Sequence, residues 1–307
     1  MKKLKINFVD FWPNFKKNDN YFFNLLSTKY ELIIEESNPD FIFFSLGFGK
    51  NEIKNYINHD CKKIFFTGEN VRPNLYFPGE IIEKNYKIQK CDFSFSFDYT
   101  QDQRNYRLPL WVMFINWFNV PHSDDRDISY LIPLENLLER KLHNKKNFCN
   151  FIYSNNQGRR LEILESIKKY KHIDCAGRLM NNMKCSIQGR GDQKYKIKFI
   201  NDYKFTIASE NSKNDGYTTE KIIHPLSVGS IPIYWGSSKI NLDFNKNCFI
   251  NVDDYENLEH LAEHIVEVDS DAEKYEKYLT SPIFPDNKIP EHLKPESVLH
   301  HMEKYIL

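Results

Sequence analysis

The chain has 307 residues, a length that suits two compact domains. Hydrophobic residues make up 41% and charged residues 27%, with only 11 Gly and 13 Pro, which excludes a disordered or collagen-like chain. Lys and Arg number 42, as do Asp and Glu, so the formal net charge is zero. This balance argues against a nucleic-acid-binding protein that neutralises phosphates over a wide surface. Any cationic site must therefore be local.

The six cysteines form no C-x-x-C pair and no Cys/His cluster at zinc spacing, which predicts reduced thiols. Asp10 and Pro13 interrupt the first apolar stretch before a signal-peptide core could form. The longest near-apolar run, Leu108 to Val120, is shorter than the roughly 20 residues of a membrane helix. We therefore expect a cytoplasmic protein with no transmembrane segment and at most peripheral membrane contact.

In the first half of the chain, short apolar runs alternate with helix-period segments, a pattern typical of parallel α/β sheets. Helices are expected at Tyr21–Thr28 and Leu134–Leu142, and the HNKKN segment at 143–147 is expected to be a linker. The expected strands are Lys5–Phe8, Glu31–Ile34, Asp40–Ser45, Lys63–Thr67 and Asp92–Phe97.

The second half repeats this alternation more regularly. Its expected strands are Phe148–Tyr153, His172–Cys175, Phe205–Ser209, Ile231–Trp235 and Cys248–Val252. Its expected helices are Arg159–Tyr170, Lys194–Asp202, Thr219–Val228 and Leu258–Val268. Polar residues follow the carboxyl ends of these strands, where open α/β sheets bind ligands. We therefore expect the functional site in this half.

The most informative segment runs from 205 to 236, where a strand leads through a polar loop into a helix that begins near Thr218 or Thr219. Lys221 in the first turn is unfavourable beside the positive helix end by about 0.3–1 kcal/mol. An anion such as a diphosphate, held between Lys221 and the free helix amides, would remove this conflict. Glu220 is either a favourable first-turn acid or an acceptor for ribose hydroxyls.

Other polar residues lie at the same kind of strand-to-helix edge. Asn211 and Tyr217 could donate hydrogen bonds to phosphate oxygens, although loop formation or packing explains either residue as well. Arg159 and Arg160 open a helix, and Arg178 follows the next strand. An arginine fork suits a phosphate group because it engages two oxygens. Surface charge is the alternative for Arg159 or Arg160, of which only one needs to point inward.

In the first half, an apolar strand ends at Thr67 and Gly68, directly before Glu69. Gly68 is expected to let the chain turn sharply there. This places the Glu69 carboxylate at a strand's carboxyl edge, from which it can accept a proton as a general base. The alternative is that Glu69 only pairs with nearby Arg72.

Two patterns resemble metal sites and are better explained otherwise. His260 and His264 fit the H-x-x-E-H zinc pattern, but the apolar stripe of their helix places both on the opposite, solvated face. Asp253 and Asp254 lie between a strand and a helix, where capping or turn formation accounts for them. We therefore predict no metal site.

Several strings together resemble the α-1,3/4-fucosyltransferases of glycosyltransferase family ten, particularly their soluble bacterial members. The resemblance is carried by FTGENVRPN at 66–74, by SENS, GYTTEKI, IPIYWGS and FINVDDY between 205 and 255, and more weakly by SNNQGRRLEIL at 154–164, IDCAGR at 173–178 and DFSFSFDY with YRLPL between 92 and 110. It implies a GT-B fold, in which two Rossmann-like domains face one another across a cleft.

The resemblance also implies how the domains divide the work. Residues 1–145 would bind the acceptor and residues 146–290 the GDP-sugar, with a C-terminal helix at about 291–307 able to pack back on the first domain. The implied reaction transfers L-fucose from GDP-fucose, with inversion, to an N-acetylglucosamine-containing oligosaccharide such as an N-acetyllactosamine-type acceptor, in α-1,3 or α-1,4 linkage. No cofactor and no metal are implied beyond the GDP-fucose donor.

Residue by residue, the resemblance assigns Lys221 to the diphosphate and Glu220 to the ribose, with Asn211 and Tyr217 as further nucleotide-binding residues. Arg178 matches the phosphate-clamping arginine, Arg159 or Arg160 is a further donor-binding residue, and Glu69 matches the catalytic base. Two alternatives stay open: a GT-B transferase that uses another GDP-deoxyhexose, and a catalytically silent carbohydrate-binding relative.

Overall fold

The computed structural model describes residues 1–70, 91–99, 101–121, 130–139, 144–187, 193–305 and 307. The chain divides into two compact units. The first unit comprises Met1–Met113 with Glu291–Leu307, and the second comprises Phe114–Pro290. The boundary therefore lies earlier than the expected residue 145, and the C-terminal segment belongs to the first unit.

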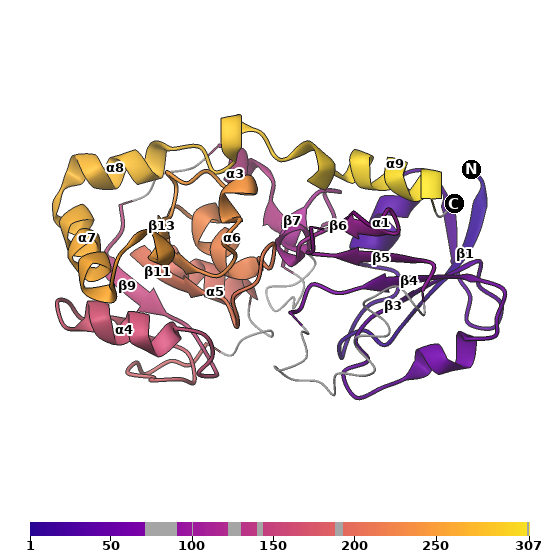
Figure 1. Ribbon diagram of the computed structural model, residues 1–307, viewed down its shortest axis with the longest axis horizontal. Coiled ribbons are helices and arrows are strands. Elements are labelled where there is room, and N and C mark those ends of the chain that lie inside the picture. The colour runs from indigo at the N-terminus through magenta and orange to yellow at the C-terminus, as the bar shows by residue number, and fades with distance from the viewer. Residues whose placement is uncertain (71–90, 100, 122–129, 140–143, 188–192, 306) are drawn as a thin grey trace. The chain divides into compact units, whose positions relative to one another are not determined.

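The first unit contains a parallel sheet with the strand order β2-β1-β3-β4-β5-β6 (Figure 1). Its strands are β1 Lys3–Val9, β2 Glu31–Ile34, β3 Phe41–Phe44, β4 Lys62–Phe66, β5 Phe93–Ser96 and β6 Asn105–Arg107. The first five match the expected runs. β6 was not expected from the sequence, because its three residues are only half-buried and show no apolar pattern.

The described residues of this unit include the α-helices α1 Tyr21–Ser27 and α9 Pro295–Tyr305, which contact each other. The Asn20 side chain caps α1 by accepting a hydrogen bond from the Phe23 amide at 3.0 Å. The apolar face of α9 buries Val298 and Met302. Short 3-10 helices are η1 Glu52–Tyr56, η2 Leu110–Phe114, which ends at the first residue of the second unit, and η7 Glu291–Leu293.

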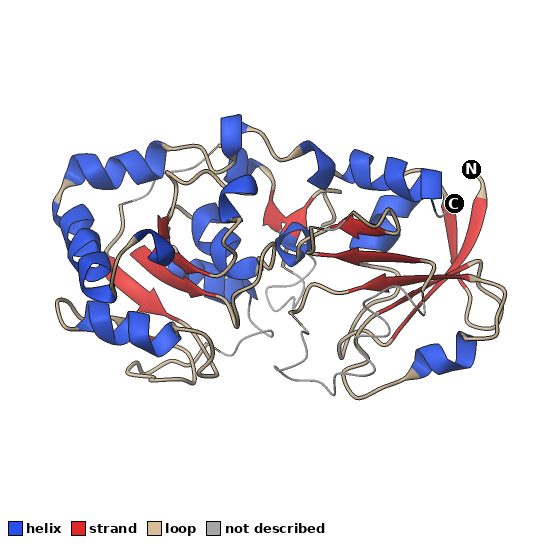
Figure 2. Ribbon diagram, viewed as in Figure 1, coloured by secondary structure: helices blue, strands red, loops and turns tan. Residues whose placement is uncertain are grey.

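The second unit contains a parallel sheet with the strand order β10-β9-β11-β12-β13 (Figure 2). These strands are β9 Asn147–Phe151, β10 Asp174–Cys175, β11 Tyr203–Ser209, β12 Ile231–Trp235 and β13 Ile250–Asn251. A separate parallel pair consists of β7 Ile115–Asn116 and β8 Ile132–Pro133.

Helices and short 3-10 turns connect these strands. The α-helices are α3 Glu135–Leu138, α4 Arg160–Lys168, α5 Gln193–Ile200, α6 Glu220–Ser227, α7 Leu258–Ser270 and α8 Ala272–Thr280, and the 3-10 helices are η4 Ile240–Leu242, η5 Val252–Asp254 and η6 Pro285–Asn287. The helix expected at 134–142 is described only as α3, because residues 140–143 lie outside the described residues. α4 and α7 pack together over the sheet in one apolar core.

The strand directions determine where a site can form in the second unit. Because its strands are parallel, their carboxyl ends share one edge of the sheet. α4 and α6 begin shortly after β9 and β11 end, and therefore start at this edge. α5 runs back to the beginning of β11, so its first turn also lies toward the same edge.

Candidate functional site

A buried carboxylate forms the centre of the candidate site in the second unit. Glu210 directly follows β11 and has no exposed surface. The Thr219 amide donates a hydrogen bond to Glu210 Oε1 at 2.8 Å, and the Thr219 hydroxyl lies 2.9 Å from Oε2. Burial raises the pKa of Glu210, and the positive charge of Lys221 opposes this rise. Glu210 was not among the expected site residues.

Lys221 lies against this carboxylate from the first turn of α6. Its Nζ is 3.1 Å from Glu210 Oε2 and donates a hydrogen bond to the Thr219 hydroxyl at 2.9 Å. The unfavourable position of Lys221 at the positive helix end is therefore offset within the chain, by the carboxylate of Glu210. An external anion is not required for that purpose, contrary to the reasoning from sequence.

A second carboxylate, Glu220, lies between two lysines. Its Oε1 is 3.8 Å from Lys221 Nζ and 3.9 Å from Nζ of Lys196, which α5 contributes. Burial alone would raise the pKa of Glu220, but the charges of Lys221 and Lys196 outweigh it and hold the pKa well below its usual range. Glu220 is therefore ionised and suited to accept hydrogen bonds from hydroxyl groups. Sequence reasoning missed Lys196.

The two arginines at the start of α4 point in different directions. Arg160 is buried, stacks 4.2 Å from the centre of the Tyr153 ring, and donates hydrogen bonds to the Asn155 carbonyl at 2.7 Å and to the Asn211 side-chain oxygen. Arg159 forms a surface ion pair with Glu162. The structure therefore brings Arg160, not Arg159, to Asn211, the residue that follows Glu210.

The remaining two expected donor residues occupy different environments. Tyr217 is buried in the loop before α6, so packing contributes to its position. Arg178 is exposed on the loop after β10. β10 is separated from β11 by β9, and therefore Arg178 lies on the same sheet edge as Lys221 but farther along it. Only Asn211, Glu220 and Lys221, with Arg160, come together as one cluster with Glu210.

Two glycines allow close packing around Glu210. Gly158 has a φ of +59°, and a Cβ there would lie 2.6 Å from the Trp235 ring and 2.7 Å from the Glu210 carbonyl oxygen. A Cβ at Gly236 would lie 2.7 Å from Cγ of Glu210. Both contacts are closer than real Cβ atoms tolerate, so these positions require glycine.

In the first unit, Glu69 is half-buried and follows β4 at the carboxyl end of that strand. The Thr67 hydroxyl accepts a hydrogen bond from the Glu69 amide at 3.1 Å, which fixes the backbone there. Gly68 does not have a positive φ, and a Cβ at this position would lie 2.6 Å from the Leu110 side chain. Close packing, rather than the expected sharp turn, therefore explains this glycine. Arg72, the alternative partner of Glu69, lies outside the described residues.

The residues with metal-like spacing have other partners. His264 Nε2 lies 3.1 Å from the Tyr278 hydroxyl, and Asp253 forms an ion pair with Lys213 at 2.7 Å. Asn251 caps η5 by accepting from the Asp253 amide. Within the part of the chain that the structure describes, no group of three or more His, Cys, Asp or Glu residues could hold a metal ion.

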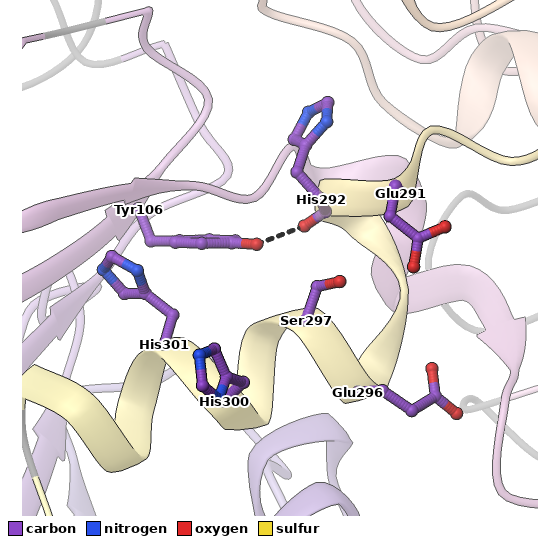
Figure 3. Close-up of a pocket in the computed structure, with 7 residues that line it drawn as sticks. All are labelled: Tyr106, Glu291, His292, Glu296, Ser297, His300 and His301. Atoms are coloured by element: carbon purple, nitrogen blue, oxygen red, sulfur yellow. Dashed lines mark hydrogen bonds between the residues drawn. The ribbon is translucent and has the colours of Figure 1, made fainter.

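The first unit contains a cavity of about 600 Å³, between β6 and the C-terminal segment (Figure 3). Its lining residues are Tyr106, Glu291, His292, Glu296, Ser297, His300 and His301. The Tyr106 hydroxyl donates a hydrogen bond to the His292 carbonyl across it. None of the expected site residues lines this cavity.

Among the described helices, none is long and apolar enough to cross a membrane.

Two family profiles match the chain. The profile described as "Glycosyltransferase family 10 (fucosyltransferase) C-term" matches residues 142–281, and "Alpha-(1,3)-fucosyltransferase FucT N-terminal domain" matches residues 6–114. The alpha-(1,3)-fucosyltransferase FucT of Helicobacter pylori is 25% identical over 290 residues, which cover 85% of this chain and 56% of that protein. A putative fucosyltransferase of Acanthamoeba polyphaga mimivirus is 33% identical over 160 residues, 48% of this chain and 27% of its own length.

The human GDP-fucose protein O-fucosyltransferase 3 is 30% identical over 216 residues, 66% of this chain and 43% of that protein. The chain thus spans about a quarter to just over half of the length of these relatives. Among solved structures, an alpha1,3-fucosyltransferase with GDP has a TM-score of 0.72 at 23% identity, covering 99% of this chain and 90% of that one. The expected fold class is confirmed: the two parallel α/β units are those of the GT-B fold.

Proposed function

Because the chain belongs to glycosyltransferase family 10, the fucosyltransferase family, we propose that it transfers L-fucose from GDP-fucose to a hydroxyl of an N-acetylglucosamine-containing oligosaccharide, in α-1,3 or α-1,4 linkage. The observation that carries this proposal is the charged corner formed by Arg160, Glu210, Glu220 and Lys221 at one sheet edge. Related alpha1,3-fucosyltransferases were solved with GDP and with GDP-fucose, which supports the choice of donor.

The second unit is the proposed donor-binding unit. Lys221 and Arg160 bind the diphosphate, helped by the free amides at the start of α6. The ionised Glu220 accepts the ribose hydroxyls, and Asn211 contacts the nucleotide beside Arg160. The resemblance also assigns Arg178 and Tyr217 to the donor. Arg178 would contact it from the loop after β10, and Tyr217 from the loop before α6. Negative charge grows on the departing diphosphate, so these fixed cations stabilise the transition state more than the ground state.

The first unit is the proposed acceptor-binding unit, with Glu69 as the general base. Glu69 would take the proton from the acceptor hydroxyl as that oxygen attacks the anomeric carbon and the bond to GDP breaks. A single displacement gives an inverted product and needs only this one base, whereas a retaining route would need a nucleophile close to the anomeric carbon. We propose no cofactor besides the donor, and a cytoplasmic location, with which six free cysteine thiols are compatible.

The test is an acceptor screen with GDP-fucose, followed by linkage analysis of the product. Transfer to an N-acetyllactosamine-type acceptor supports the proposal. Competition by other GDP-deoxyhexoses separates the second candidate, a GT-B transferase with a different donor. Binding of GDP-fucose without transfer to any acceptor would favour a catalytically silent carbohydrate-binding protein.

The role of Glu69 is tested with Glu69→Gln, which removes the base and keeps the shape of the side chain. Glu52→Gln, an exposed acid of the same unit, is the matched control. We expect Glu69→Gln to lose at least about 100-fold in kcat, the low end of a general-base contribution, with GDP affinity unchanged. Wild-type turnover in Glu69→Gln would refute this assignment.

A further inference from the structure

The side chain of Lys196 is mostly buried and makes no hydrogen bond to the residues that the structure describes. Its side chain retains 14% of its exposed surface, and its nearest charged partner, Glu220 Oε1, is 3.9 Å from Nζ. This separation allows an ion pair but exceeds hydrogen-bond length. An ammonium group has three donors, and burying them without acceptors is unfavourable. The position therefore leaves hydrogen-bonding capacity unused.

Other polar atoms near Lys196 share this property. Gln193, one turn earlier on α5, is 6% exposed, and its side-chain oxygen has no hydrogen-bond partner among the described residues. His224 on α6 is fully buried, and neither ring nitrogen has a partner there either. Burial, and after it the positive charge of Lys196, holds the pKa of His224 well below its ordinary value, so this ring is neutral beside Lys196. The polar groups between α5 and α6 therefore have unused hydrogen-bonding capacity among the described residues. The carboxylate of Glu210, in contrast, has hydrogen-bond and ion-pair partners.

The contacts of the corner also indicate which cation has hydrogen-bond donors left unused. Lys221 is already 3.1 Å from the buried Glu210 carboxylate, and Arg160 donates to Asn155 and Asn211. Among the described residues, Lys196 has a single ion pair, the long one with Glu220. Among these three cations, Lys196 is the one whose ammonium group makes no hydrogen bond to the described residues.

From this geometry we propose that Lys196 is a further donor-binding residue, which contacts the diphosphate of a bound nucleoside diphosphate sugar. The inference rests on the proposed function and deepens it. When a donor binds, its ribose hydroxyls donate hydrogen bonds to the Glu220 carboxylate. The neighbouring Lys196 ammonium then donates a hydrogen bond to a phosphate oxygen. The same contact strengthens as negative charge grows on the departing diphosphate, so Lys196 assists turnover as well as binding.

A purely structural role for Lys196 makes a different prediction. If Lys196 only neutralises Glu220, its removal weakens every ligand that uses the ribose contact by the same factor. Guanosine has the ribose but no phosphate, so a comparison of GDP with guanosine separates the two roles.

The experiment measures GDP and guanosine binding by calorimetry for the wild-type protein and for Lys196→Met. Lys198→Met is the matched control, because it makes the same change at an exposed position on the same helix. We expect Lys196→Met to weaken GDP about 10- to 100-fold, as for a lost hydrogen bond to a charged group, with guanosine affinity unchanged. Lys198→Met should leave both unchanged. Equal losses for GDP and guanosine, or no loss for GDP, would overturn the inference.

A measurement on the wild-type protein covers the case in which Lys196→Met does not fold. Amine labelling, read by peptide mass spectrometry, should slow at Lys196 when GDP is added and not when guanosine is added. An unchanged labelling rate with GDP overturns the inference. If the wild-type protein binds no GDP, the proposed function falls as well. If it binds GDP and transfers fucose while Lys196→Met behaves like wild type, only the role of Lys196 falls.

Discussion

Removing Lys221 should destabilise the fold as well as weaken binding at the proposed donor site. Glu210 has no exposed surface, and Lys221 Nζ at 3.1 Å is its charged partner. Coulomb's law with an effective dielectric constant of 20 gives about 5 kcal/mol for charges at this distance. Breaking a buried pair from one side costs about 3–5 kcal/mol in other proteins. We therefore expect Lys221→Met to lower the free energy of unfolding by about 3 kcal/mol at neutral pH.

The loss of unfolding free energy in Lys221→Met should depend on pH in a defined direction. Burial already raises the pKa of Glu210, and Lys221→Met removes the charge that opposes this rise. In the folded variant, the pKa of Glu210 therefore lies above the value of about 4.3 that a glutamate has in the unfolded chain. Its stability is therefore retained below the unfolded pKa and lost as the pH rises through the folded pKa. The difference from wild type should be small near pH 4 and largest at neutral pH.

A second substitution provides the decisive comparison. Glu210→Gln keeps an acceptor for the Thr219 amide and removes the buried charge, so Glu210→Gln with Lys221→Met should regain at least about 1–2 kcal/mol over Lys221→Met alone. GDP affinity should stay low, because the cation is still absent. Urea unfolding followed by tryptophan fluorescence measures the stabilities, and calorimetry measures GDP binding. If the loss of unfolding free energy in the double variant equalled the sum of the losses in Lys221→Met and Glu210→Gln, this account of the corner would be refuted.

Three further substitutions test other parts of the second unit. Arg160→Lys should lower unfolding free energy by about 1–2 kcal/mol, since an ammonium cannot reproduce both guanidinium contacts, whereas Arg159→Lys should be neutral in the same urea titration. Gly158→Ala should cost more than Gly49→Ala, about 1–3 kcal/mol beyond the strain of a positive φ, because Gly49 has open space where its Cβ would lie. Burial would raise the pKa of Asp269, but hydrogen bonds from two lysines outweigh it and lower the pKa. Its stabilisation is therefore complete above the unfolded value of about 3.9 and lost as pH falls, so Asp269→Asn should flatten the acid side of the stability curve measured by thermal unfolding.

The strands were predictable where burial on both faces makes the sequence uniformly apolar. β3 is the run FIFF and β12 the run IPIYW, and every residue of both is buried. β6 escaped notice because its side chains are half-buried and polar, and it pairs only with β5 at the edge of the sheet. α8 was missed for a related reason: its apolar stripe is short, formed by Tyr275, Tyr278 and Leu279, and only Leu279 is buried.

The site was predictable where it lies within one continuous segment. The strand-loop-helix pattern located Glu220 and Lys221, because a helix that begins after a parallel strand must start at the carboxyl edge of the sheet. The side of α4 that faces inward could not be decided, since Arg159 and Arg160 are adjacent at the first turn. Lys196 lies on another helix, and only the packing of α5 against α6 brings it to Glu220.

The structure also constrains which anions the corner should prefer. Glu210 and Glu220 add two carboxylates to a corner with three cations, so a bare phosphate held by Lys196 or Lys221 would also meet repulsion from Glu220. A ligand that carries hydroxyl groups next to its phosphates turns Glu220 from a repulsive neighbour into a hydrogen-bond acceptor. Glu210 cannot act in this way, because Thr219 and Lys221 already surround its buried carboxylate. We therefore expect the corner to favour a ribose diphosphate over free phosphate, with Glu220 as the residue that makes this distinction.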